Sequence, residues 1–201
     1  MGQEMAPWDS RREVKDTTAN GQPAVAIAQY SRTDGAGVPR YVSTAILTKD
    51  MHVLRSSWVG NGAEPGACRV DVAGQNGSLV IGDGSAASVD MGERPMPDFA
   101  LPVALASSSL RDGETIRFRI YHCSWSDNSP SAIMFLDFAG TVSSGSMQRA
   151  GSTSPEPVWV VTGTPAFPYK AWIAKSDRVV LKTVVPQGAD GEMIETFSGS
   201  R

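Results

Sequence analysis

Short runs of alternating apolar and polar residues fill most of this chain. Alternation with a period of two predicts β-strands that bury one face. The segment 115–123 shows the pattern best, and the segment 133–142 is apolar on both faces, which is typical of a central buried strand. We expect further strands at 24–30, 41–47, 51–59, 67–73, 78–81, 86–91, 158–162, 178–185 and 193–197.

Asn-Gly and Asp-Gly dipeptides separate these runs. Both residue types tolerate the positive φ that tight hairpin turns require, so each dipeptide predicts a turn. They are Asn20-Gly21, Asp34-Gly35, Asn61-Gly62, Asn76-Gly77, Asp83-Gly84, Asp112-Gly113 and Asp190-Gly191.

Helical periodicity is weak along the whole chain, and only residues 104–111 suggest a short helical turn. Residues 99–105 alternate, but Pro102 removes a ladder donor, which predicts an edge strand or an irregular segment. The Ser/Gly/Pro-rich stretch 143–157 predicts a long loop. Together these patterns predict an all-β fold, a β-sandwich or jelly-roll-like barrel, with one domain over residues 23–201.

The first residues, 1–22, differ from the rest in being polar without periodicity. We expect an extended N-terminal arm that docks on a partner. Trp8, next to Pro7, is its one large apolar anchor.

Composition and charge exclude some functions. The 201 residues carry 18 basic and 21 acidic side chains, and no basic block appears, which argues against direct nucleic-acid binding. No apolar run approaches the roughly 18 residues of a membrane span. No signal peptide is recognisable as written, so the compartment stays open: no export, or a signal already removed.

Catalytic chemistry has weak support. His122 with Asp127 or Asp137 and a serine, Ser124 or Ser126, has the residue types of a hydrolase triad, but no Gly-x-Ser-x-Gly elbow accompanies them. His122 also shares an apolar strand face, which favours a structural role. We therefore expect no enzyme activity.

Asp137 interrupts an apolar strand, so we expect it to be partly buried and held in an ion pair with Arg117 or Arg119. Metal-ligand spacings are missing from the sequence. Asp83, Ser85 and Asp90 carry oxygen ligands suited to calcium, but Gly82-Asp83-Gly84 is first a turn. We predict neither metal nor cofactor.

The chain has two cysteines, Cys68 and Cys123. Cys68 shares a face with apolar Val70, whereas Cys123 shares parity with Arg117 and Arg119. Because a disulfide needs converging side chains, we expect two free thiols rather than a Cys68–Cys123 bridge.

Aromatic residues supply the binding candidates. Trp125 lies in a polar segment just past a strand, where a flat ring is suited to stack on sugar. The proline-rich segment that follows residue 164 is suited to docking on a partner. The predicted interface residues are Trp8, Trp125, Phe167, Tyr169 and Trp172.

These features leave three functional hypotheses. The first is a non-enzymatic structural component of an ordered assembly, such as a virion or appendage, that self-associates or joins other subunits through the arm and the aromatic loops. The alternative is an exported β-sandwich binding module for carbohydrate or protein. A hydrolase with a concealed site ranks last.

Overall fold

Strands dominate the molecule. The computed structural model describes residues 11–33, 39–60, 66–73, 76–81, 86–92, 95–123, 133–186 and 192–196. Within these residues no helix is long and apolar enough to cross a membrane.

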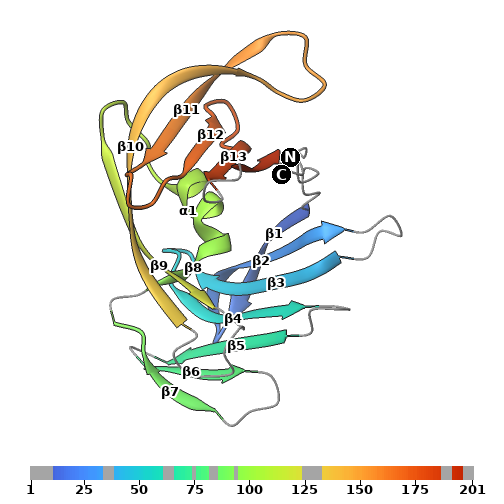
Figure 1. Cartoon of the computed structure of the whole chain (residues 1–201), viewed down its shortest axis with the longest axis vertical. Coiled ribbons are helices and arrows are strands. Elements are labelled where there is room, and N and C mark those ends of the chain that lie inside the picture. Colours follow the sequence, from blue (N-terminus) through green and yellow to red (C-terminus); the bar gives the residue numbers. More distant parts are fainter. Residues whose placement is uncertain are drawn as a thin grey trace, which may run out of the picture. The chain divides into compact units, whose positions relative to one another are not determined.

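The first sheet has seven strands in sequential order, each antiparallel to the next. Figure 1 shows it as a curved surface running from β1 to β7. Its strands are β1 (Arg11–Ala19), β2 (Gln22–Thr33), β3 (Pro39–Thr48), β4 (Val53–Gly60), β5 (Gly66–Ala73), β6 (Asn76–Ile81) and β7 (Ala87–Asp90).

The second sheet also has seven strands, in the order β14 to β8. A 3₁₀ turn, η1 (Asp98–Ala100), and a short helix, α1 (Leu101–Ser107), separate β8 from β9. The strands are β8 (Met96–Pro97), β9 (Thr115–Cys123), β10 (Ile133–Gln148), β11 (Pro155–Gly163), β12 (Lys170–Ala174), β13 (Val180–Pro186) and β14 (Glu192–Thr196).

The all-β prediction is confirmed, and sequence neighbours are also sheet neighbours. The chain packs into two compact units. The first-sheet unit comprises residues 11–101 and 118–137, and the second-sheet unit comprises residues 102–117 and 138–201. The single domain predicted for residues 23–201 stays a prediction.

A row of small and apolar side chains crosses the first sheet and forms part of its core. Strand register aligns Ile27, Ala45, Ser56, Val70 and Leu79 on five adjacent strands. Each is at most 3% exposed. The alternation found in the sequence therefore places one face of this sheet inward, as predicted.

Half of the predicted arm belongs to the first sheet. Residues 11–19 form β1, which pairs with β2 along its whole length, from Arg11 opposite Tyr30 to Ala19 opposite Gln22. The Asn20-Gly21 turn, with φ of 51° and 74°, makes this hairpin and confirms the turn prediction. Cross-strand pairing explains how so polar a segment becomes a strand. Residues 1–10 lie outside the described ranges.

Asn76-Gly77 is not a turn. It opens β6, and Gly77 lies opposite Val72 of β5. A Cβ on Gly77 would lie 2.7 Å from Cγ of Met91, so the glycine makes room for the methionine rather than for a bend.

The segment expected to be an edge strand, 99–105, is η1 followed by α1. Pro102 explains the difference, because the first turn of a helix needs no N–H from that position. At the other end Arg178 donates from Nε to the carbonyl of Ala106 at 3.1 Å and from Nη2 to that of Ser108. One side chain thus caps a helix whose sequence signal was weak.

The long loop predicted for residues 143–157 is also wrong. Residues 143–148 continue β10 and pair with β11, for example Gly145 opposite Val158. Serine-rich residues are extended here because the partner strand supplies the ladder. Only the tip, 149–154, lies between the strands, and Arg149 closes it with bonds to Glu156 at 2.6 Å and Asp177 at 2.9 Å.

Candidate functional site

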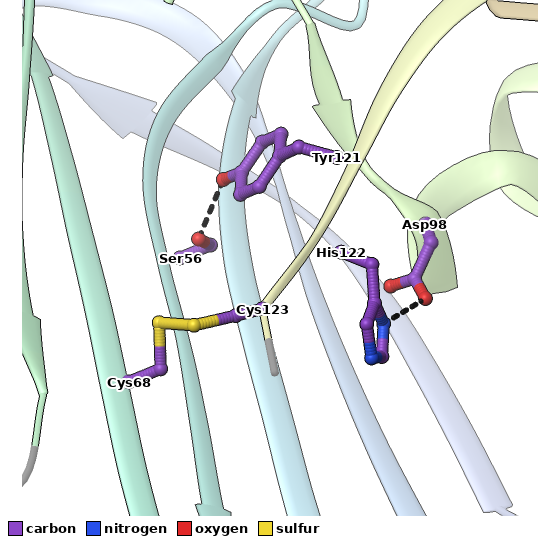
Figure 2. Close-up of a disulfide and its surroundings, with 6 residues drawn as sticks. All are labelled: Ser56, Cys68, Asp98, Tyr121, His122 and Cys123. Atoms are coloured by element: carbon purple, nitrogen blue, oxygen red, sulfur yellow. Dashed lines mark hydrogen bonds and ion pairs between the residues drawn. A yellow bond between two sulfur atoms is a disulfide. The ribbon is translucent and has the colours of Figure 1, made fainter. Parts of the chain in front are cut away.

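The end of β9 places three consecutive side chains in different surroundings. Tyr121 and Cys123 point to one side of the strand and His122 to the other (Figure 2). Tyr121 is fully buried, and its hydroxyl lies 2.6 Å from the Ser56 hydroxyl. Burial raises the pKa of the Tyr121 phenol, so it stays protonated.

Cys123 and Cys68 form a disulfide between β9 and β5, which corrects the prediction of free thiols (Figure 2). Their Cα atoms are 6.5 Å apart. The prediction used the shared parity of Cys123 and Arg117, but Arg117 lies in the exposed first half of β9. From Ile120 onward the strand enters the core, and Tyr121 and Cys123 are both 0% exposed.

His122 bonds to a carboxylate that the sequence did not single out. Its Nδ1 lies 2.8 Å from Oδ2 of Asp98 in η1, with side-chain exposures of 41% and 33%. The hydrogen bond to Asp98 raises the pKa of His122. In the proposed triad, Ser124, Ser126 and Asp127 lie outside the described residues.

Asp137 is placed differently from the prediction. Its side chain is 81% exposed, 3.5 Å from Nη1 of Arg119. The pairing with an arginine is confirmed, but the burial is wrong. The start of β10 is open to solvent, since Met134 is exposed as well. Apolar residues on both faces therefore did not indicate a buried strand at this end.

The five predicted interface residues separate into three groups. Trp8 and Trp125 lie outside the described residues. Phe167 and Tyr169 join Phe138 in an aromatic cluster, with ring centroids 5.5 Å and 5.7 Å from that of Phe138. Tyr169 is buried and Phe167 half-buried, so both rings pack within their own unit.

Two facing glycines make the space for this cluster. Gly140 of β10 lies opposite Gly163 of β11. A Cβ on Gly140 would lie 2.8 Å from Cζ of Phe138, and one on Gly163 would lie 2.4 Å from the carbonyl oxygen of Phe167. The segment around residue 165 is thus fitted to the sheet rather than free for docking.

Trp172 lies on the opposite face of the second sheet. Along β12, Tyr169, Ala171 and Ile173 are buried, whereas Lys170 is exposed and Trp172 half-buried. Strand alternation accounts for this division as far as Trp172. Beyond it Ala174 is buried as well, in a core cluster with Val158 and Leu181 against which Trp172 packs. Trp172 is therefore the one predicted interface residue that the structure places on a partly open sheet face.

The ammonium groups of two lysines lie over the Trp172 ring. The ammonium of Lys170 is 5.0 Å from the ring centroid and that of Lys182 is 5.3 Å from it. Lys182 lies directly opposite Trp172 on β13, and Thr162 lies opposite Lys170 on β11. We define the Trp172 face as Val160, Thr162, Lys170, Trp172 and Lys182.

The sequence analysis missed the two lysines and Asp98. Lys170 and Trp172 are two residues apart on a strand, which places them on one face, but β12 was taken for part of a loop. Asp98 lies in no strand, so no periodicity linked it to His122. Within the described ranges, no group of three His, Cys, Asp or Glu side chains is arranged to hold a metal ion.

Comparison with known proteins adds little. No protein-family model and no curated protein matches the chain. It is similar to the crystal structure of a DUF1089 family protein from Pseudomonas aeruginosa, with 14% sequence identity, 92% of this chain and 94% of that chain covered, and a TM-score of 0.45. We draw no conclusion about activity, ligand or partner from so distant a similarity.

Proposed function

We propose that the protein is an exported, non-enzymatic binding module that recognises carbohydrate on the Trp172 face. The observation that carries the proposal is the half-buried indole of Trp172 on a partly open sheet face, with the ammonium groups of Lys170 and Lys182 over its ring. Indole rings stack on the apolar faces of sugars, and ammonium groups donate hydrogen bonds to sugar hydroxyls.

Export is supported by the Cys68–Cys123 disulfide. Disulfides persist in oxidising compartments and are rare in the cytosol of most organisms. Both cysteines of the chain are used in this bond.

Among the described residues around β9, neither Cys123 nor Ser56 is placed to act as a nucleophile with His122. Cys123 is in a disulfide, so it supplies no thiolate. Ser56 bonds to Tyr121 on the side of β9 opposite to His122, which places that hydroxyl out of reach of the imidazole (Figure 2). The His122–Asp98 pair then stabilises the fold.

Affinity electrophoresis of the purified protein through gels that contain soluble polysaccharides tests the proposal. Retardation by at least one polysaccharide is expected, and Trp172→Ala should lower that affinity about tenfold or more, since a flat aromatic anchor carries a large share of binding energy. The matched control is Trp159→Ala, because Trp159 lies on the other face of β11. Equal loss in both variants, or no loss in Trp172→Ala, would contradict the proposal.

The assembly hypothesis has one observation of its own. β1 is the end strand of the first sheet, and its Val14 is 49% exposed. End strands with exposed apolar residues pair readily with other chains, although the charges of Arg11, Glu13 and Lys15 oppose such pairing here. We propose assembly through residues 1–10 and β1 as the second candidate.

Light scattering at several concentrations separates the two functions. An assembly component should form a closed oligomer that deletion of residues 1–10 converts to a folded monomer. A binding module should be a monomer with and without these residues, and the Trp172→Ala variant should also be a monomer.

A further inference from the structure

The Trp172 face brings two cations together on one aromatic ring. Many described basic side chains form ion pairs, as in Lys15–Glu13, Arg119–Asp137 and Arg149–Glu156. Among the described side chains, Lys170 and Lys182 contact the Trp172 ring and form no ion pair.

Strand geometry places both ammonium groups where a single ligand reaches them. Lys182 is the direct cross-strand neighbour of Trp172, and Lys170 precedes Trp172 by two residues on the same face. Adjacent strands are about 4.8 Å apart and alternate residues of one strand about 6.6 Å apart. A ring of pyranose size stacked on the indole thus has one lysine along the strand and the other across it.

We propose that the ligand of the Trp172 face is an acidic polysaccharide whose uronate carboxylates pair with Lys170 and Lys182 while a sugar ring stacks on Trp172. This inference rests on the proposed function, because it names the class of carbohydrate that the same face binds. Thr162, exposed opposite Lys170, supplies a hydroxyl to the same ligand.

The net charge of the chain does not attract an acidic polysaccharide, so the attraction has to come from the Trp172 face itself. At a formal charge of −3 the protein as a whole repels a polyanion. Binding to uronate therefore depends on the two lysines and weakens with salt, since exposed charges are screened within about 8 Å at physiological ionic strength.

The test compares uronate polymers with neutral ones. Affinity is measured for polygalacturonate, alginate and hyaluronate, for polygalacturonate whose carboxylates are methyl-esterified, and for neutral dextran, galactan and soluble cellulose oligomers. The variants are Trp172→Ala, the double variant Lys170→Gln with Lys182→Gln, and the control Lys175→Gln. Lys175 contacts Trp159, which lies on the other face of the sheet, so its variant removes one charge but leaves the Trp172 face intact.

We expect binding to at least one uronate polymer and weaker binding to the methyl-esterified form. The double lysine variant should lose about 2- to 30-fold in affinity, because each exposed pair contributes about 1.4- to 5-fold. The remaining affinity of the double variant should depend less on salt concentration. Lys175→Gln should change neither the affinity nor its salt dependence by more than 2-fold.

Two outcomes overturn the inference and differ in what they say of the proposed function. Binding only to neutral polymers, lost in Trp172→Ala and kept in the lysine variants, rejects the acidic ligand and keeps the carbohydrate site. Binding to no polymer, or uronate binding that Lys175→Gln weakens as much as the double variant does, rejects both.

Discussion

His122 and Tyr121 are neighbours in the sequence, yet each has a different electrostatic environment. Tyr121 points into the core, where its hydroxyl is satisfied by Ser56. His122 points to the half-open side, where Asp98 favours its protonated form. Alternation along β9 thus separates a group held neutral by burial from one whose charged form is stabilised by a carboxylate.

The His122–Asp98 pair predicts a pH-dependent contribution to stability. Because the pKa of His122 is raised in the fold, this contribution is complete below about pH 6.5, the ordinary histidine value, and is lost as pH rises through the folded pKa. Asp98→Asn should therefore cost more at pH 6 than at pH 8, by less than about 1 kcal/mol for so exposed a pair. Chemical denaturation at both pH values measures the difference.

The control for this prediction is a His122→Asn background. There Asp98→Asn should cost the same at both pH values. An NMR titration that finds the His122 pKa unchanged by Asp98→Asn in the otherwise wild-type protein would show that the pair is not electrostatically coupled.

Asp137 leads to a second prediction at this scale. Its pair with Arg119 is exposed and 3.5 Å long, so Asp137→Asn should lower the free energy of unfolding by less than about 1 kcal/mol. Urea denaturation measures this value. A loss of about 2 kcal/mol or more would mean that Asp137 is buried, as the sequence had suggested.

At the scale of elements, the hairpin of β10 and β11 depends on positions without side chains. The Gly140–Gly163 pair leaves a hollow that the Phe138 ring and the backbone of Phe167 and Tyr169 occupy. The backbone of the segment after β11 approaches Gly163 more closely than any Cβ permits. The aromatic segment is therefore fixed to the sheet by a backbone contact.

Gly163→Ala should destabilise the protein by about 1–3 kcal/mol or more, since the new Cβ meets the Phe167 carbonyl at 2.4 Å and the backbone must shift. Gly145→Ala is the matched control in the same hairpin. Its Cβ would meet a methyl group of Val160, which a rotamer change moves away, so the cost should be smaller. Thermal unfolding of both variants measures the difference. Equal melting temperatures would contradict the prediction that Gly163 is needed for the close backbone contact.

Elements were predicted correctly where their own residues determine the structure, and were missed where a distant partner strand determines it. β9 is found where its alternation placed it, and the Asn20-Gly21 turn follows from two residues. β1 and the Ser143–Gln148 part of β10 were missed because their partners, not their own composition, make them strands. α1 was predicted only in its second half, at 104–107, because its apolar residues are buried on all sides, which removes the helical stripe.

The candidate site was predicted only in part for the same reason. Trp172 was among the residues named, but as part of an aromatic, proline-rich segment and not of a strand. Its lysine neighbour on β13 and the Asp98 partner of His122 depend on how distant segments meet, and no spacing in the sequence encodes that.

On the scale of the whole molecule, the first-sheet unit is not a continuous piece of chain. It is completed by residues 118–137, which follow α1 and whose described parts, 118–123 and 133–137, belong to β9 and β10. Tyr121 and Cys123 from this segment contribute to its core. The Cys68–Cys123 disulfide and the packing of Tyr121 therefore connect this unit to a segment that follows residues 102–117 of the other unit in the sequence.

The protein without the Cys68–Cys123 disulfide should be substantially less stable than the oxidised protein. Its cysteines are 55 residues apart, and closing a loop of that size contributes about 4 kcal/mol in the chain-entropy account. Dithiothreitol, or Cys68→Ala with Cys123→Ala, should lower the melting temperature, and dithiothreitol should not affect the double variant. Alkylation of the unreduced, denatured protein should label no cysteine, and labelling of both would contradict the bond.

The place of the disulfide in the sequence has a consequence for synthesis. Cys68 leaves the ribosome 55 residues before Cys123, which at about 5–20 residues per second is roughly 3–11 s. With only two cysteines in the chain, Cys68 has no intramolecular partner during this interval. A nascent chain that stops before residue 123 therefore keeps a thiol that the finished protein lacks, and this thiol chemically marks the product as incomplete.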